Sequence, residues 1–482
     1  MISQNILLNT DSYKPSHWLQ YPKDAQATFF YGGSRGGAYN KTIFFGLQYI
    51  LKAYLDKPLT HKDVDEARDI YALHGVPFNE AGFRDIVDRL DGKLPVRIKA
   101  VPEGSLIPEH LPMFTLESTD EQSFWLPSYL ETMLLRVWYP CTVATVSFSV
   151  RQVILEALRR TSDDPEGQLP FKLHDFGSRG VSSLESAGIG GAAHLTSFMG
   201  TDTVSALVLL RNYYHEKMAG YSIPAAEHST MTAWGRNHEE EAYRNMLKQY
   251  AKPGALLAVV SDSYDIYNAV ENIWGKTLRQ EVIDSGATLV VRPDSGDPVA
   301  VVTKCALLLE KTFGATLNSK GYKVLNHVRL IQGDGISPET IPEILLSLEK
   351  EGFSADNIAF GMGGGLLQKV NRDTQKFAFK CSATKRKGQW QDTYKDPVTD
   401  PGKKSIRGRV QLLVNDAEHY ILHHMDTDTV PLGYRDAMEV VWENGVLTKD
   451  QNLESIRKRI AKHDNVWQAK DKEGERHKVI AA

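Results

Sequence analysis

A glycine run that suits a phosphorylated ligand follows one of the apolar segments of the chain. The motif FGMGGGLLQKVNRD places Gly361, Gly363, Gly364 and Gly365 within five residues, with Arg372 just downstream. Glycine lets the backbone approach a ligand closely, and the start of a following helix offers free N–H groups to a phosphate. The motif lacks the P-loop spacing GxxxxGK[ST]. It favours a phosphate site, and the alternative is a tight structural turn.

Two further motifs combine carboxylates with an arginine or with glycines. RPDSGDP puts Arg292 two residues before Asp294. Arginine neutralises phosphate oxygens, and a carboxylate can hold ribose hydroxyls or Mg²⁺. Asp294 or Asp297 can equally cap the next helix, and this motif alone does not decide between the two interpretations. In QGDG, Asp334 follows Gly333 and suits either ribose or a turn.

Isolated polar and aromatic residues add weaker signals. SDSYD offers Asp262 and Asp265, one of which can be only a helix cap, and Asp202 in GTDT is more typical of a cap than of a ligand. In HDFGSRG, Arg179 suits pyrophosphate, while Phe176 offers a flat face to an aromatic ring or packs in the core.

His228 in AAEHST is a further candidate. A lone histidine is more often structural, but histidine can act as a nucleophile toward phosphoryl groups, and phosphate-suited residues surround it in the sequence. The chain has no HExxH motif. The residues together indicate an enzyme that binds a phosphorylated, sugar-like ligand with magnesium.

Most of these motifs come directly after short apolar runs that read as buried strands. The runs lie at residues 171–173, 221–226, 256–260, 288–291, 328–331 and 358–360. Two helices are predicted between them. One runs from 336 to 352 with Ser337 as its cap, and the other runs from Asp297 and Pro298 to Gly314.

Strands that alternate with helices predict a parallel α/β sheet, whose ligands bind at the carboxyl ends of the strands. An open doubly wound sheet binds ligands there too, but six such junctions favour an irregular βα barrel. We expect a barrel at 146–385 that carries the active site. We expect a flanking α+β domain built from an N-terminal region, 1–145, and a C-terminal segment, 386–482.

Composition excludes several other classes of protein. The 482 residues carry a formal net charge of −4, which argues against a nucleic-acid-binding protein. Cys141, Cys305 and Cys381 are too few and too far apart for a disulfide framework or a zinc site. The N-terminus lacks a secretory pattern, and no apolar run approaches the roughly 20 residues of a membrane span. We expect a cytoplasmic protein.

Several long motifs, taken in order, resemble the nicotinamide phosphoribosyltransferase family, type II phosphoribosyltransferases related to nicotinate phosphoribosyltransferase. They are DSYK, FGLQYIL, HDFGSRGVSSLESAGIGGAAHL, FMGTDTVSAL, GYSIPAAEHSTMTAWG, VVSDSYDIYNA, VVRPDSGDP, IQGDG, FGMGGGLLQKVNRD, FKCS and KDPVTDPGKKS. The resemblance runs from about residue 5 to about residue 408.

The resemblance implies an activity. Such an enzyme transfers the phosphoribosyl group of phosphoribosyl pyrophosphate to nicotinamide, in NAD salvage, with Mg²⁺ and with ATP as co-substrate. It is a homodimer with shared active sites. ATP is coupled through a phosphohistidine, here His228, with Glu227 beside it.

The resemblance also implies the roles of single residues. Nicotinamide stacks between Phe176 and Tyr13 of the partner subunit, and Asp202 accepts a hydrogen bond from the carboxamide. The remaining implied contacts are Arg179 to pyrophosphate; Arg292 and Asp294 to phosphate and ribose; Gly333 and Asp334 to ribose; Gly363, Gly364 and Arg372 to the 5′-phosphate; Lys395, Lys403 and Arg35 to phosphates; and Asp262, with Asp294, to magnesium.

The chain departs from the family pattern at three positions. Ser178 stands where tyrosine is common, Ala258 where a serine can line the tunnel beside the ring, and Met362 where the glycine run has a serine.

Three other functions stay open. Nicotinate phosphoribosyltransferase shares the barrel, but a carboxylate at Asp202 favours the amide over the acid. A sugar-phosphate lyase or isomerase would need a catalytic lysine or carboxylate pair at the strand ends. A non-catalytic relative would have lost His228, Asp294 or the glycine run, and all are present.

Overall fold

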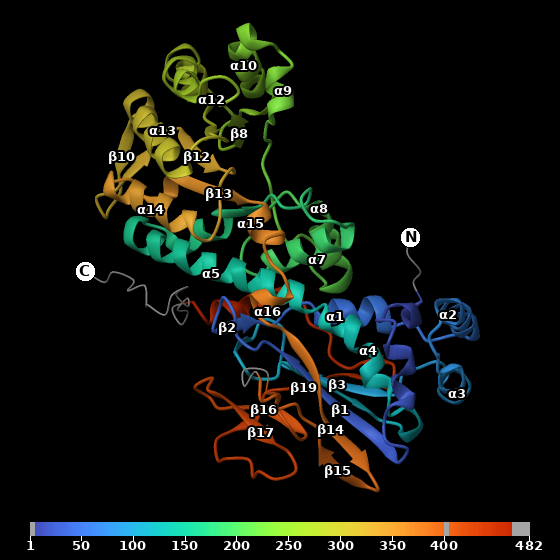
Figure 1. The fold of residues 1–482 in the computed structure, drawn as a ribbon. Helices are drawn as coiled ribbons and strands as arrows, with labels where there is room; N and C mark the ends of the chain where they lie inside the picture. The colour runs from blue at the N-terminus through green and yellow to red at the C-terminus, as the bar shows by residue number, and fades with distance from the viewer. Residues whose placement is uncertain (1–4, 400–403, 465–482) are drawn as a thin grey trace.

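The computed structural model describes residues 5–399 and 404–464 (Figure 1). Lys403, an expected phosphate contact, lies outside the described residues. Two layered parts are visible in Figure 1, a parallel α/β part drawn mostly in green to orange and an antiparallel part drawn in blue, cyan and red.

The α/β part is built on one parallel sheet. Its strands, in spatial order, are β7 (Gly200–Thr201), β6 (Leu173–Asp175), β13 (Ile358–Met362), β12 (Val328–Gln332), β9 (Thr288–Arg292) and β8 (Leu256–Val260). Every neighbouring pair is parallel. This arrangement confirms the expected α/β class with strands alternating with helices.

The segment 221–226 joins the two edges of this sheet and closes it into an irregular barrel. Tyr221 forms a parallel bridge with Gly200, and Ala225 forms one with Ala258. The prediction of a regular strand here is wrong, because the segment makes only isolated bridges. Pro224 lies in it and has no N–H group to donate. The predicted strand at 171–173 also shifts, since 169–171 form a 3₁₀ turn and β6 begins at Leu173.

Helices surround the barrel. They are α5 (Trp138–Thr161), α6 (Pro165–Gln168), α7 (Leu184–His194), α8 (Val204–Tyr213), α9 (His228–Thr232), α10 (Glu239–Tyr250), α11 (Ile266–Asn268), α12 (Arg279–Ser285), α13 (Pro298–Phe313), α14 (Thr340–Lys350) and α15 (Gly364–Leu367). A small hairpin of β10 (Ala315–Leu317) and β11 (Lys323–Leu325) follows α13.

The two predicted helices differ in accuracy. The one after Asp297 is confirmed, because the Asp297 side chain accepts from the N–H of Ala300 and the helix ends before Gly314. The other begins at Thr340 rather than near 336. Ser337 accepts from the N–H groups of Glu339 and Thr340, so it caps a turn that precedes the helix.

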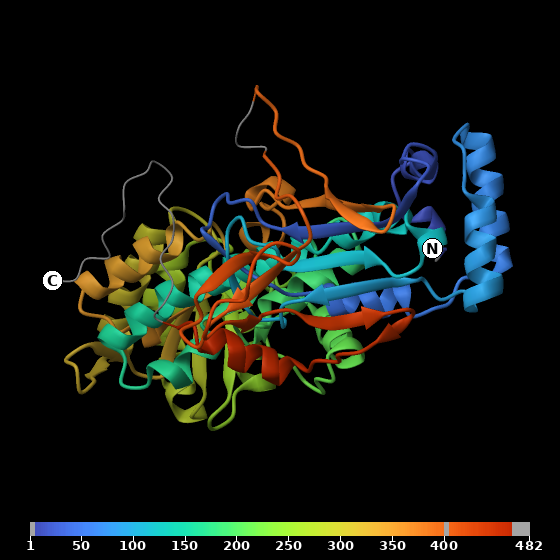
Figure 2. The same cartoon turned by 90° about the horizontal axis from the view of Figure 1, so that it is seen from below.

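The flanking part contains a seven-stranded sheet that takes strands from both ends of the chain. Its order is β15 (Gln389–Asp392), β14 (Ala378–Arg386), β1 (Ala25–Gly33), β5 (Phe114–Ser118), β3 (Val96–Ala100), β19 (Glu439–Glu443) and β20 (Val446–Leu447). Figure 2 shows these blue, cyan, orange and red strands side by side. This mixing of N- and C-terminal strands confirms the expected flanking α+β domain.

Smaller elements complete this part. They are the pair β2 (Lys41–Ile43) and β4 (Leu106–Pro108), the sheet of β16 (Val410–Val414), β17 (Tyr420–His424) and β18 (Arg435–Asp436), and the helices α1 (Leu47–Ile50), α2 (His61–His74), α3 (Glu80–Leu90), α4 (Leu126–Leu135) and α16 (Leu453–Ala461). Helix α5 and strand β14 run across the expected domain boundaries at 145 and 385, which stay predictions.

Among the described residues, one helical stretch, Leu126–Thr161, has the length and hydropathy of a membrane span. It comprises α4 and α5. Of its most apolar window, 78% is buried inside the fold, which is typical of a core helix.

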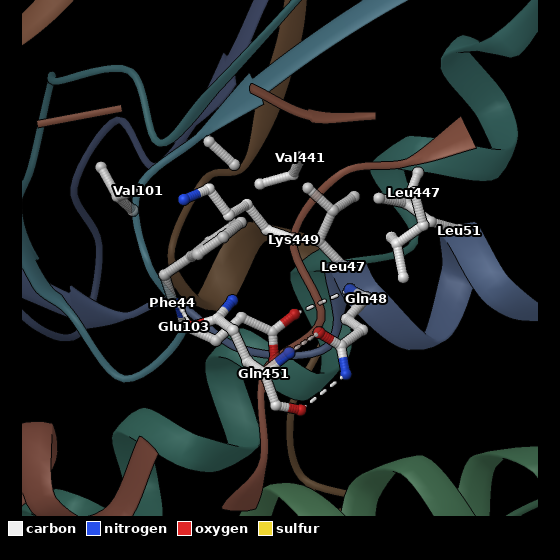
Figure 3. A pocket seen from close by; sticks show the side chains of 11 residues that line it. Phe44, Leu47, Gln48, Leu51, Val101, Glu103, Val441, Leu447, Lys449 and Gln451 are labelled. Carbon is white, nitrogen blue, oxygen red and sulfur yellow. Dashed lines mark hydrogen bonds between the residues drawn. The ribbon is translucent and has the colours of Figure 1, made fainter. Parts of the chain in front are cut away.

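A small cavity of about 10 Å³, the size of one water molecule, lies where α1, the loop after β3 and the segment before α16 meet (Figure 3). Glu103 is buried there and accepts from the N–H of Gln48 at 2.7 Å, while Gln451 N–H donates to the Gln48 side chain at 2.7 Å. Burial raises the pKa of Glu103. These bonds join distant segments and give the cavity a structural role.

Candidate active site

The carboxyl ends of the barrel strands bring most of the predicted site residues to one end of the barrel. Phe176 follows β6, Gly333 follows β12, Asp294 follows β9 and Asp262 follows β8. Because parallel strands all end on the same side, residues far apart in the sequence meet there.

Phe176 is the half-buried centre of this group. Its ring lies against Gly361 of β13, where an added Cβ would stand 1.9 Å from Phe176 Cε2. Its backbone is fixed as well, since Phe176 N–H donates to the carbonyl of Met362 at 3.1 Å. The Arg292 guanidinium carbon lies 5.6 Å from the ring centroid. Gly361 therefore provides the room that the aromatic ring needs.

Arg292 and Asp294 form a two-point ion pair beside the ring. The Arg292 Nε donates to Asp294 Oδ1 at 3.1 Å, and the second nitrogen donates to Oδ2 at 2.7 Å. Gly333 lies against this pair, because an added Cβ would stand 3.2 Å from Asp294 Oδ1 and 3.3 Å from Phe176 Cε2. Asp297, rather than Asp294, caps the helix. The structure thus leaves Asp294 in the site.

Asp262 connects two loops. Its Oδ1 lies 2.9 Å from His228 Nε2, and its Oδ2 accepts from the Ser295 hydroxyl. The Asp262 side chain is 3% exposed, whereas that of His228 is 46% exposed. His228 is the first residue of α9, and the exposed Glu227 is its N-cap. The other aspartate of SDSYD, Asp265, is a cap, since it accepts from two N–H groups of α11.

Asp202 is not the cap of the helix that follows it, because α8 begins at Val204 with Thr203 as the capping position. Instead its Oδ1 accepts from the Ser222 hydroxyl at 2.7 Å, and its N–H donates to the carbonyl of Asp175 at 3.0 Å. Burial raises the pKa of the neighbouring Asp175 to about 6. Asp202 is exposed, and its backbone lies beside Asp175, the residue that precedes Phe176.

The other predicted contacts on the barrel lie in exposed turns. Arg179 is exposed in the turn after Phe176. Asp334 is exposed as well, and its carbonyl accepts from the Gln332 side chain at 2.9 Å, which fixes the turn and leaves the carboxylate open. An added Cβ at Gly363 would stand 3.2 Å from the carbonyl oxygen of Phe176. Gly364 begins the short helix α15.

A second polar site is a cavity of about 210 Å³ near the start of β14. It is lined by Arg35, Arg372, Lys380, Lys395 and Ser405. Three of these were expected phosphate contacts, so the structure brings together cations that lie far apart in the sequence. Burial and the nearby cations lower the pKa of Lys380, while Glu131 opposes this shift. Sequence reasoning missed Lys380, although it lies in the quoted motif FKCS.

Tyr13 lies elsewhere in the single chain. Tyr13 is 56% exposed in the flanking part, and its ring lies 5.0 Å from the His17 ring, measured between centroids. None of the described contacts joins it to Phe176.

The described residues include no group of three or more histidine, cysteine, aspartate or glutamate side chains arranged to hold a metal. Mg²⁺ is usually held by one or two carboxylates together with substrate phosphates and water. Asp262 fits this pattern as a single carboxylate. Asp294 does not fit it in this arrangement, since the Arg292 cation already neutralises its charge through two hydrogen bonds.

Comparisons with known proteins identify the family of the chain. Residues 171–441 match the nicotinate phosphoribosyltransferase (NAPRTase) family, and residues 5–98 match the nicotinamide phosphoribosyltransferase N-terminal domain. The chain is 62% identical to a nicotinamide phosphoribosyltransferase of Xanthomonas campestris pv. campestris over 94% of this chain and 97% of the relative. It is 32% identical to one of Acinetobacter baylyi over 95% and 97%.

Two solved structures share the fold. The nicotinate-nucleotide pyrophosphorylase from Pyrococcus furiosus has a TM-score of 0.64 at 15% identity and covers 96% of this chain and 97% of its own. The human nicotinic acid phosphoribosyltransferase has a TM-score of 0.57 at 16% identity, with 94% and 92% covered. At these identities the likeness concerns the fold, which is the one expected from the sequence.

Proposed function

Because the chain belongs to the nicotinate phosphoribosyltransferase family, with nicotinamide phosphoribosyltransferases among its relatives, we propose that it makes nicotinamide mononucleotide and pyrophosphate from nicotinamide and phosphoribosyl pyrophosphate. The observation that carries this proposal is the convergence of Phe176, Arg292, Asp294 and Gly333 at the barrel end. A cytoplasmic role in NAD salvage follows from it.

Phe176 supplies the flat surface on which the pyridine ring of nicotinamide stacks. Its ring is fixed by Gly361 and by its backbone bond to Met362, so the nitrogen of the bound pyridine is held in one orientation. The exposed Asp202 carboxylate accepts a hydrogen bond from the carboxamide, and it would repel the carboxylate of nicotinate. Tyr13 of the partner subunit covers the other face of the pyridine in the homodimer that this proposal includes.

The reaction breaks the bond between the sugar carbon and pyrophosphate and forms a bond to the pyridine nitrogen. Positive charge develops on the sugar as pyrophosphate leaves, and the carboxylates of Asp294 and Asp334 stabilise it. Arg292 and Arg179 bind phosphate oxygens. The 210 Å³ cavity with its four cations takes further phosphates. Mg²⁺, when bound with the substrate beside Asp262, neutralises part of the pyrophosphate charge.

ATP enters this proposal through His228. Asp262 holds Nε2 of the imidazole, so Nδ1 is the nitrogen that attacks the γ-phosphorus of ATP, and ADP leaves. The buried carboxylate orients the ring and stabilises the positive charge that the ring gains. Glu227 fixes the start of α9 as its N-cap.

The deciding experiment measures mononucleotide formed from nicotinamide or from nicotinate, each with phosphoribosyl pyrophosphate and Mg²⁺, with and without ATP. We expect product from nicotinamide, and more of it with ATP. Product from nicotinate alone would favour nicotinate phosphoribosyltransferase, the function named by the matched family. Absence of product from both bases would contradict the proposal.

A further inference from the structure

We propose that Ser222 is a specificity-determining residue, because it orients the Asp202 carboxylate that reads the carboxamide of the substrate. This inference rests on the proposed function. It means that the segment 221–226, which closes the barrel, helps the site to discriminate between nicotinamide and nicotinate. The Ser222 hydroxyl donates to Asp202 Oδ1 at 2.7 Å.

The backbone segment that carries this hydroxyl is held in place at both ends. Tyr221, the residue before it, donates its N–H to the carbonyl of Met199 at 2.7 Å and accepts from the N–H of Thr201 at 3.1 Å. At the other end of the segment, Ala258 N–H donates to the carbonyl of Pro224 at 2.9 Å. Both sides of Ser222 are therefore anchored to barrel strands.

The carboxylate is anchored from its own strand as well. Asp202 N–H donates to the carbonyl of Asp175, so the backbone of residue 202 is fixed against the end of β6, one residue before Phe176. A free aspartate side chain would sample several rotamers at an exposed position. The bond from Ser222 selects one of them.

The bond gives the two carboxylate oxygens of Asp202 different roles. A serine hydroxyl has one hydrogen, and Ser222 donates it to Oδ1. Among the described residues, Oδ2 has no hydrogen-bond partner, so it is the oxygen that can accept from the amide of nicotinamide.

The test compares Ser222→Ala and Ser222→Thr with the unchanged protein. The measured quantity is the ratio of kcat/KM for nicotinamide to that for nicotinate. We expect Ser222→Ala to lower this ratio about tenfold, since hydrogen bonds to charged groups have effects of that order. Ser222→Thr keeps the hydroxyl, so its ratio should stay close to that of the unchanged protein. Ser319→Ala is a matched control, because Ser319 donates to Asp163 at 2.6 Å in another exposed pair.

A double substitution separates orientation from a general structural effect. If Ser222 acts through Asp202, adding Ser222→Ala to Asp202→Asn should change the ratio less than about twofold. An unchanged ratio in Ser222→Ala, or an equal loss in both backgrounds, would overturn this inference while the proposed function stands. A wild-type protein that makes no product from nicotinamide would instead overturn the proposed function itself.

Discussion

The phenyl ring of Phe176 rests on Gly361, a residue 185 positions further along the chain, with no room for a methyl group between them. An added Cβ at Gly361 would stand 1.9 Å from Cε2 and 2.1 Å from Cδ2 of the ring. The two residues meet because β6 and β13 are parallel neighbours, with Gly361 paired to His174. The glycine therefore sets the height of the surface on which an aromatic substrate would stack.

Gly361→Ala should displace the Phe176 ring. We expect kcat/KM for nicotinamide to fall at least about tenfold, and unfolding to become easier by about 1–3 kcal/mol through overpacking. Steady-state kinetics and thermal unfolding measure the two effects. Gly188→Ala, in helix α7, is the control. An added Cβ at Gly188 would stand 3.4 Å from its nearest atom, Leu209 Cδ1, which is an ordinary van der Waals contact. An active Gly361→Ala enzyme with unchanged KM would contradict the role given to Phe176.

Asp294→Asn should lower kcat about 100-fold, because a neutral amide stabilises a developing cation far less than a carboxylate does. Single-turnover rates measure this effect separately from substrate binding. The same motif contains its control, Asp297→Asn, since asparagine caps helices as well as aspartate does. Equal losses in the two variants would show that Asp294 has a structural role alone.

His228→Ala should abolish the stimulation by ATP and leave slow synthesis without ATP, because the nitrogen that takes the phosphoryl group is gone. Radiolabelled γ-phosphate retained on the protein gives a second measurement. His61→Ala is the matched control, since His61 also begins a helix and pairs with an aspartate, Asp88, at 2.8 Å. If synthesis with and without ATP fell equally, the division between coupling and bond formation would be wrong.

Lys380→Ala should weaken the binding of a polyphosphate substrate by raising its KM about tenfold, and the effect should shrink as salt screens the cavity. Lys385→Ala on the same strand is the control, because Lys385 faces Glu121 at 3.8 Å and does not line the cavity. Equal KM values in the two variants would remove Lys380 from the phosphate site.

The stability of the fold should depend on pH through Lys172. Burial lowers its pKa to about 7 from 10.5, and its Nζ donates to the carbonyl of Asp356 at 2.9 Å. Between these two values the unfolded chain holds a proton that the folded chain lacks, so stability falls as the pH drops from about 10.5 toward 7. We expect the free energy of unfolding of Lys172→Met, measured in urea, to rise relative to that of the wild type as the pH falls from 9.5 to 7. The rise should be roughly 1.4 kcal/mol per pH unit, a few kcal/mol in all. A difference between the proteins that does not change with pH would contradict this.

Local sequence was enough to predict the α/β class and most of the barrel strands. Alternating apolar runs and turn residues define buried strands over a few residues, and the position of a motif after its strand fixes the end of the sheet on which it lies. The cap at Asp297 is equally local, since its side chain reaches only to Ala300. The apolar run at 221–226 is the exception. It contains Pro224, and the structure shows isolated bridges there in place of the predicted strand.

Contacts between distant residues were decided by the tertiary structure alone. His228 and Asp262 are 34 residues apart, and neither the bond between them nor the one from Ser222 to Asp202 follows from spacing. The same holds for Lys380, which joins Arg35 and Arg372 only because β14 pairs with β1 across the sheet. Sequence determines which chemical groups each loop carries. Closure of the barrel and pairing of the strands determine which of those groups meet, because the pairing of strands sets the distances between them.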